Sequence, residues 1–285
     1  EYIDRLLENY KLSVTHLDTY LKCPLVFYFN NLLRIPRAKN DSFAFGNAIH
    51  FSLEHIFKEM KKNEGVFPSV QYVTKTFEYF LNLFKESFTE TQFKKRLEDG
   101  NSILPAFYNH YVNTWNTNVE LEVSFSTVFE DVPITGKMDK IEINGNSATV
   151  VDYKTGKIAN VKKYHSDDRP LSAEDLSAIE EPQYYQAHGG DYWRQAVFYK
   201  ILIDNEPKKN WSVSRVVFDF VEADKDSKKY NQVVIAVSPE DIAIVSKQIK
   251  ESYANILAKK FDGCGKKDCE WCTFMNQVKM NTKAW

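Results

Sequence analysis

The stretch Val150–Gly156, which reads Val-Val-Asp-Tyr-Lys-Thr-Gly, is an apolar segment that ends in two charged residues and a glycine. Its composition is typical of a buried strand. Side chains two positions apart in a strand share a face, so Asp152 and Lys154 point the same way. Charged groups on an apolar strand are costly to bury unless they are paired or used. Taken alone, this pattern is more typical of a salt bridge at a strand end than of a reactive site.

The preceding strand changes this interpretation. Gly136–Ile141 reads Gly-Lys-Met-Asp-Lys-Ile, and a turn is predicted at Gly145-Asn146. Asp139 and Asp152 are about equally far from this turn, so the two carboxylates are expected to lie close together in an antiparallel hairpin. Like charges repel at short distance unless a cation lies between them. The hairpin therefore predicts a site for a hard divalent cation such as Mg²⁺.

The hydrophobic pattern elsewhere predicts helices before this hairpin and a mixture of strands and helices after it. Residues 157–181 are polar and lack a clear period, which favours a loop or a mobile flap. The expected strands cover 121–127, 134–143, 148–154, 213–221 and 233–237. The expected helices begin at Ser13 or Thr15, at Gly46 and at Pro239, or cover 70–86, 103–117 and 191–204.

These elements predict a mixed α/β fold, with a central mixed sheet flanked by helices, a helical N-terminal region and a Cys-rich C-terminal tail. We expect one domain over 1–285, divided into a helical part (1–118), a catalytic α/β core (119–260) and the tail (261–285). The N-terminal helices and the tail are expected to pack together on one side.

The composition limits the possible classes of protein. The chain has 285 residues, of which 43% are hydrophobic and 27% charged, which is typical of a soluble globular protein. No apolar run reaches the roughly 20 residues that span a bilayer, and no signal peptide is visible, so a cytoplasmic protein is expected. The net charge of −2 means that nucleic acid would bind only to a local basic surface. The chain lacks a starting Met, which favours a piece of a longer protein.

The chain has four cysteines, Cys23, Cys264, Cys269 and Cys272. Three of them fall within nine residues, and without a secretory signal a disulfide scaffold is not expected. The spacing predicts a metal site, and the C-x2-C pair alone favours zinc. Plain buried thiols are the alternative.

Taken in order, the motifs resemble the PD-(D/E)xK nucleases, and in particular the nuclease domains of RecB- and AddB-type helicases. The two strands supply G-x-x-D and V-D-Y-K-T-G. Phe45–His50 matches the Phe-Gly pair and the histidine that precede them in the RecB-type branch, and Gln195 and Tyr199 match its Gln and Tyr four residues apart. Leu121–Phe125 matches a further strand motif only loosely, and this match leaves it open whether Glu122 faces the site. The resemblance extends from Leu12 to the cysteine tail.

The resemblance implies a Mg²⁺- or Mn²⁺-dependent deoxyribonuclease, and an exonuclease in particular, that acts in DNA end processing and recombinational repair. His50, Asp139, Asp152 and the carbonyl of Tyr153 would hold the metal, and Lys154 would orient or deprotonate water or stabilise the phosphorus. Gln195 and Tyr199 would position substrate or water. The lysines at positions 157, 162 and 163 fit phosphate contacts and a solvated loop equally well.

The resemblance also implies that the four cysteines hold a [4Fe–4S] cluster, as in AddB-type nucleases, with zinc as the alternative. One departure is that Cys264 precedes the C-x2-C pair, whereas the third late cysteine of the family usually follows it. The chain has no Walker A motif, so it is not expected to be an ATP-driven motor by itself. The resemblance implies a superfamily 1 helicase in the same chain or complex. The alternative function is a catalytically inactive, nuclease-like DNA-binding module of such a complex.

Overall fold

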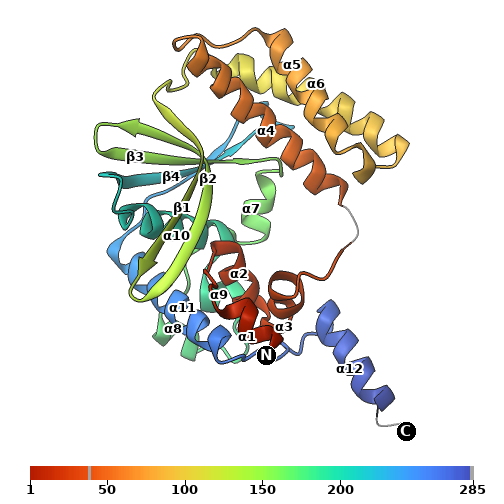
Figure 1. Ribbon diagram of the computed structural model, residues 1–285, viewed down its shortest axis with the longest axis vertical. Coiled ribbons are helices and arrows are strands. Elements are labelled where there is room, and N and C mark those ends of the chain that lie inside the picture. Colours follow the sequence, from red (N-terminus) through yellow and green to blue (C-terminus); the bar gives the residue numbers. More distant parts are fainter. Residues whose placement is uncertain (38–39, 283–285) are drawn as a thin grey trace.

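The computed structural model describes residues 1–37 and 40–282, and within them the chain folds into a mixed α/β structure around a five-stranded sheet (Figure 1). The strand order along the sheet is β1-β2-β3-β4-β5. The fold class predicted from the sequence is confirmed. The strands are β1 (Val119–Phe129), β2 (Val132–Asn144), β3 (Ser147–Lys154), β4 (Ser212–Phe220) and β5 (Gln232–Ile235).

The first three strands form the predicted antiparallel meander. Gly145 has a φ of 58° in the turn between β2 and β3, a conformation that favours glycine. The register places Lys140 opposite Val151, so Asp139 and Asp152 lie at neighbouring positions where the paired part of the hairpin ends. β3 then pairs in parallel with β4, and β4 pairs antiparallel with β5. The parallel pair makes the sheet mixed.

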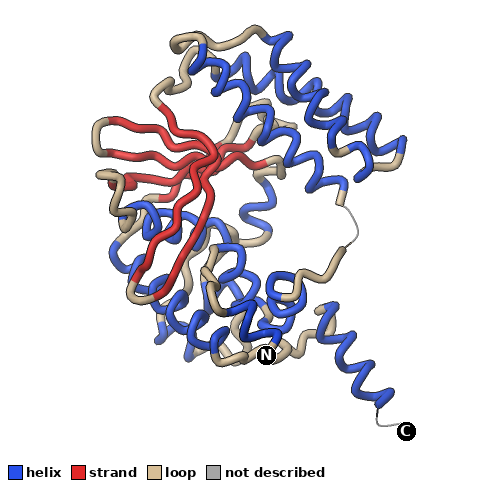
Figure 2. The backbone as a smooth tube through the Cα atoms, viewed as in Figure 1, coloured by secondary structure: helices blue, strands red, loops and turns tan. Residues whose placement is uncertain are grey.

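Two groups of helices cover the two faces of the sheet, as Figure 2 shows. The first group comprises α4 (Asp41–Lys62), α5 (Val70–Leu83) and α6 (Glu90–Tyr111). The second group includes α2 (Val14–Lys22), α10 (Asp191–Asp204) and α11 (Pro239–Leu257). The remaining helical segments are α1 (Tyr2–Leu7), α3 (Pro24–Phe27), η1 (Tyr28–Leu32), η2 (Lys85–Ser87), α7 (Ala159–Lys163), α8 (Ala173–Ser177), α9 (Tyr184–His188) and α12 (Glu270–Thr282).

The alternation of β3 determines which side chains face which group of helices. Ala148 and Val150 pack in the core on the α10 face, whereas Val151 and Tyr153 pack in the core on the α4–α6 face. Because strand side chains alternate, Asp152 and Lys154 face α10. The sheet therefore presents both charged side chains of the Asp-Tyr-Lys segment to one helix.

Two predicted helix starts and one predicted loop were wrong. α4 begins at Asp41 and not at Gly46, because the side chain of Asn40 accepts hydrogen bonds from the backbone N–H groups of the first turn. α6 begins at Glu90, thirteen residues before the predicted start, because Thr89 and Gln92 form a capping box. The segment 157–181, predicted as a loop, contains the short helices α7 and α8.

The two ends of the described chain pack together, but only part of the helical N-terminal region takes part. Tyr20 in α2 donates a hydrogen bond to the Lys260 carbonyl at 2.8 Å, and Phe27 in α3 packs against Phe261. The helices α4 to α6 lie on the other side of the sheet (Figure 1). The predicted packing of the whole N-terminal region with the tail was therefore too broad. No helix in residues 1–37 and 40–282 is both long and apolar enough to cross a membrane.

Candidate active site

Asp152, at the end of β3, is held by three side chains that come from β3 and α10. The Lys154 ammonium lies 2.7 Å from Asp152 Oδ2. Gln195 Nε2 donates to Asp152 Oδ1 at 2.9 Å, and the Tyr199 hydroxyl donates to the same oxygen at 3.2 Å. Lys154 Nζ also donates to Gln195 Oε1 at 3.2 Å. The structure thus brings together four of the five residues that were predicted to act in catalysis.

The fifth, Asp139, lies at the neighbouring position of β2 and joins this group to α4. Its Oδ2 atom lies 3.1 Å from His50 Nδ1 and accepts a hydrogen bond from the Tyr153 backbone N–H at 3.0 Å. The N–H and C=O of one strand residue point to the same side. The Tyr153 carbonyl is therefore directed to the side on which Asp139 lies, as a metal ligand at that position would require.

The charges in this group depend on one another. Burial raises the pKa of Asp152, against the opposing effect of Lys154. Burial also acts on Asp139, but its hydrogen bond and ion pair with His50 hold the pKa of that carboxyl below its usual range. The pKa values of His50 and Lys154 are raised, because the carboxylates outweigh the effect of burial. His50 thus lies beside the half-buried carboxyl of Asp139, and the ammonium of Lys154 lies beside the buried carboxyl of Asp152.

The donor set fits a hard divalent cation. Asp152 Oδ2 is buried and, among the described residues, accepts no well-oriented hydrogen bond, although Lys154 lies beside it. Two carboxylates, an imidazole and a backbone carbonyl are ligands that Mg²⁺ and Mn²⁺ accept, with water and phosphate oxygens completing the coordination. The residues that the sequence predicted as metal ligands thus come from neighbouring positions of the fold, and the Lys154 ammonium lies beside the Asp152 Oδ2 atom.

The sequence did not indicate the aromatic rings that surround the site lysine. Lys154 Nζ lies 4.8 Å from the ring centre of Tyr192 and 5.1 Å from that of Phe218, and these rings stack at 4.6 Å. Tyr192 stands three residues before Gln195, so the helical spacing of Tyr192, Gln195 and Tyr199 was a signal that could have found it. Such rings limit the orientations of the lysine ammonium.

Glu122 lies directly across from Asp139, because its neighbours Leu121 and Val123 pair in an unshifted register with Lys140 and Met138. It has a φ of 52° and forms no ladder pair itself. Its carboxylate pairs with Lys137, and the neighbouring carboxylates of Asp139 and Glu54 add to the effect of burial in raising its pKa. Glu54 follows His50 by one helical turn, and the sequence did not indicate it.

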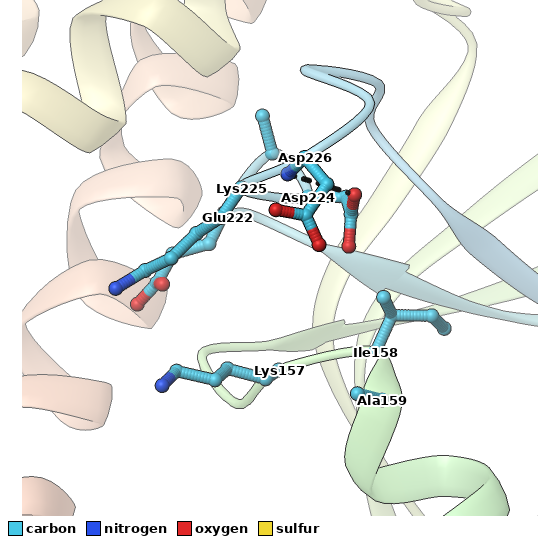
Figure 3. Close-up of a pocket in the computed structure, with 8 residues that line it drawn as sticks. Lys157, Ile158, Ala159, Glu222, Asp224, Lys225 and Asp226 are labelled. Carbon is cyan, nitrogen blue, oxygen red and sulfur yellow. Dashed lines mark hydrogen bonds between the residues drawn. The ribbon is translucent and has the colours of Figure 1, made fainter.

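A cavity of about 190 Å³ lies beyond the ends of β3 and β4 (Figure 3). Lys157 lines one side, while Glu222, Asp224, Lys225 and Asp226 line the other, and the Lys157 and Lys225 side chains extend in the same direction in Figure 3. The mixed charge of this cavity makes it a poor phosphate pocket as a whole. Of the three lysines predicted to contact phosphate, Lys157 lines this cavity.

The other two lysines of that prediction lie on α7. Lys162 is 77% exposed and pairs with Asp167 at 2.8 Å, and Lys163 lies over the ring of Tyr164. Both contacts are with neighbouring residues. Phosphate contact by Lys162 and Lys163 therefore stays a prediction.

The four cysteines also come together, far from the carboxylates in the sequence. Their Sγ atoms all lie within 4.8 Å of one another. Cys23 and Cys272 are buried, and Cys264 and Cys269 are partly exposed. The predicted metal site at the cysteines thus has the necessary proximity.

Comparison with known proteins identifies the family. A family model described as the PD-(D/E)XK nuclease superfamily matches residues 11–277. The chain belongs to this superfamily. Superfamily membership agrees with the resemblance drawn from the Asp-Tyr-Lys strand, whereas no comparison tests the RecB- and AddB-type context. None of the curated proteins compared with the chain matches it significantly.

Two solved structures are similar to this nuclease-superfamily chain. One, described as a "putative exonuclease" from Eubacterium rectale, is 11% identical, with a TM-score of 0.55, and the match covers 93% of this chain and 87% of the other. At that identity the likeness shows the fold alone. The other, SSO0001, is 13% identical, with a TM-score of 0.34, and the match covers 96% of this chain and 92% of the other. Its TM-score is too low to support an argument.

Proposed function

We propose that this chain is a metal-dependent DNA nuclease whose active site consists of His50, Asp139, Asp152, Lys154 and the Tyr153 carbonyl. The observation that carries the proposal is the convergence of α4, β2, β3 and α10 on one pair of carboxylates, the buried Asp152 and the half-buried Asp139. Membership of the PD-(D/E)XK nuclease superfamily supports the reaction class.

The residues have distinct roles in this proposal. His50, Asp139, Asp152 and the Tyr153 carbonyl would hold Mg²⁺ or Mn²⁺. A bound ion of this kind would polarise the phosphate and lower the pKa of a coordinated water. Lys154, fixed between Asp152 and Gln195, would direct its ammonium at the attacking water or at the developing charge on phosphorus.

Gln195 and Tyr199 act through Asp152. Both donate to Asp152 Oδ1, and Gln195 Nε2 lies 2.6 Å from the Tyr199 hydroxyl. Because Oδ1 is occupied by these donors, Oδ2, which lies beside the Lys154 ammonium, is the oxygen that would face a cation. The two helix residues thus orient the carboxylate and restrict its rotation.

The finer function is an exonuclease that processes DNA ends in recombinational repair, with a superfamily 1 helicase in the same chain or complex. Its support is the order of the RecB- and AddB-type motifs in the sequence and the likeness of fold to a protein described as a putative exonuclease. We further propose that residues 1–285 form a single nuclease domain.

Cleavage of linear and covalently closed DNA, single- and double-stranded, tests this function. The assay uses Mg²⁺ or Mn²⁺, with EDTA as the metal-free control. Wild type should cut linear DNA only with metal, and Asp152→Asn should lower the rate by about 100-fold or more. Asp226→Asn, on the exposed rim of the cavity, is the matched control and should cut like wild type.

The substrates separate the alternatives. Cutting of closed circles would identify an endonuclease. If a well-folded wild type cuts nothing yet binds DNA, the protein is the inactive DNA-binding module instead. Equal rates for wild type and Asp152→Asn would show that the active site lies elsewhere.

A further inference from the structure

The four cysteine sulfurs are arranged at the distances that a single metal ion requires. Cys23 Sγ lies 3.8 Å from Cys272 Sγ and 3.9 Å from Cys269 Sγ, and Cys264 Sγ lies 3.8 Å from Cys272 Sγ. All four lie within 4.8 Å of one another. One Zn²⁺ with Zn–S bonds of about 2.3 Å places tetrahedral sulfurs about 3.8 Å apart. Three of the six separations thus match a tetrathiolate around one ion, and the other three lie within 4.8 Å.

A [4Fe–4S] cluster does not fit these separations. In such a cluster each thiolate binds a different iron atom, so the cluster core lies between every pair of cysteine sulfurs. The sulfurs must then lie farther apart than around a single ion.

The backbone around the sulfurs is suited to thiolates. The Cys264 N–H donates to Cys23 Sγ at 3.4 Å. Such a donor stabilises a negative charge on sulfur.

Two glycines allow this approach. A Cβ at Gly263 would lie 2.8 Å from Cys272 Sγ, closer than such contacts permit, and Gly265 has a φ of 73°. Only glycine fits both positions without movement of the loop. The loop between Gly263 and Cys272 is thus shaped around the sulfur atoms.

We propose that Cys23, Cys264, Cys269 and Cys272 bind one structural Zn²⁺ ion in place of an iron–sulfur cluster. The ion joins the start of α3 to the segment before α12. Phe29 and Trp271 stack beside it at 4.2 Å, and Trp271 Nε1 donates to Asn30 at 2.8 Å. The site closes a loop of more than 240 residues, since Cys23 and Cys264 are 241 positions apart. It is independent of the proposed nuclease reaction.

Metal analysis of the full chain tests this proposal. The protein is purified without oxygen from cells supplied with both zinc and iron, and zinc, iron and acid-labile sulfide are measured per chain. The expected result is one zinc, no iron, no sulfide and no visible colour. Replacement by Co²⁺ should give the intense visible absorption of a tetrahedral cobalt thiolate. Iron with sulfide, or a folded chain without metal, overturns the proposal.

Variants and chelation extend the test without relying on activity. Cys23→Ser should lose the zinc, whereas Lys154→Met, changed only at the nuclease site, should retain it. If Cys23→Ser does not fold, removal of zinc from wild type with a chelator should lower Tm by roughly 5–10 °C. An unchanged Tm after complete zinc removal would contradict the structural role.

Discussion

Replacement of Lys154 by Met should affect stability and cleavage in separable ways. Met has nearly the length of the lysine side chain and retains contact with Tyr192 and Phe218, but it removes the ammonium that lies 2.7 Å from Asp152 Oδ2. Asp152 is then left as a buried carboxylate with only Gln195 and Tyr199 as donors. The variant therefore isolates the effect of one positive charge.

The expected loss of stability follows from the burial of the pair. Breaking a fully buried ion pair costs about 3–5 kcal/mol. Lys154 is 21% exposed and Asp152 9%, and Asp152 can take up a proton because burial already raises its pKa. We therefore expect a loss of about 2 kcal/mol without metal. Mg²⁺ should restore much of it, since a cation beside Asp152 replaces the missing charge.

Cleavage should fall by about 10²–10⁴-fold and should not recover with Mg²⁺, because the metal replaces the charge but not the ammonium group. Urea unfolding with and without Mg²⁺ measures the first effect, and DNA cleavage under single-turnover conditions measures the second. Lys75→Met, at an exposed position of α5, is the matched control and should change neither by much. A Lys154→Met protein that cuts at the wild-type rate would refute the assignment, and a stability loss that Mg²⁺ leaves unchanged would refute the charge argument.

Three further changes test the helices and the site. Tyr192→Leu removes a ring beside the ammonium of Lys154 and should lower kcat about tenfold with little change in KM. The control Tyr164→Leu, at a 61% exposed position, should cut DNA at the wild-type rate. Burial, assisted by Arg34, lowers the pKa of His16 to about 4, so the unfolded chain binds its proton first. The contribution of His16 to stability should thus be complete above pH 6.5 and be lost towards pH 4. Over this range the free energy of unfolding should change by at most about 1.4 kcal/mol per pH unit because of His16. Urea unfolding of His16→Phe should show a smaller dependence of this free energy on pH. Gly100→Ala would bring a Cβ within 1.9 Å of the Phe77 ring and should destabilise the protein by about 1–3 kcal/mol in urea, whereas Ser102→Ala on the exposed side of the same helix should not. Equal stability of these two variants would contradict the packing of α5 against α6.

The parts that the sequence predicted well depend on local geometry. The hairpin β2–β3 has a short turn, so equal distances from Gly145 place Asp139 and Asp152 at neighbouring positions. Strand alternation then directs Asp152 and Lys154 to one face, and helical spacing directs Gln195 and Tyr199 to the same site. Each of these relations spans few residues and follows from a fixed period.

The parts that the sequence did not predict depend on contacts between distant segments. The start of α6 lies in a charged stretch with few apolar residues, and its side chains acquire a face only by packing on α5. Tyr192 lies on a helix that is buried nearly all round, so hydrophobicity did not single it out. The distances between the cysteine sulfurs join segments some 240 positions apart, and spacing alone could not choose between one ion and a cluster.

The joining of the two chain ends has a consequence for biosynthesis. The side chains of the candidate active site lie between residues 50 and 199, whereas the last three sulfur ligands lie at positions 264–272. During translation, every residue of the candidate active site is therefore made before Cys264. Cys23 therefore lacks its three partner cysteines until some 240 further residues have been synthesised. A chain that stops near residue 260 would carry every proposed nuclease residue, with its ends still open to proteases.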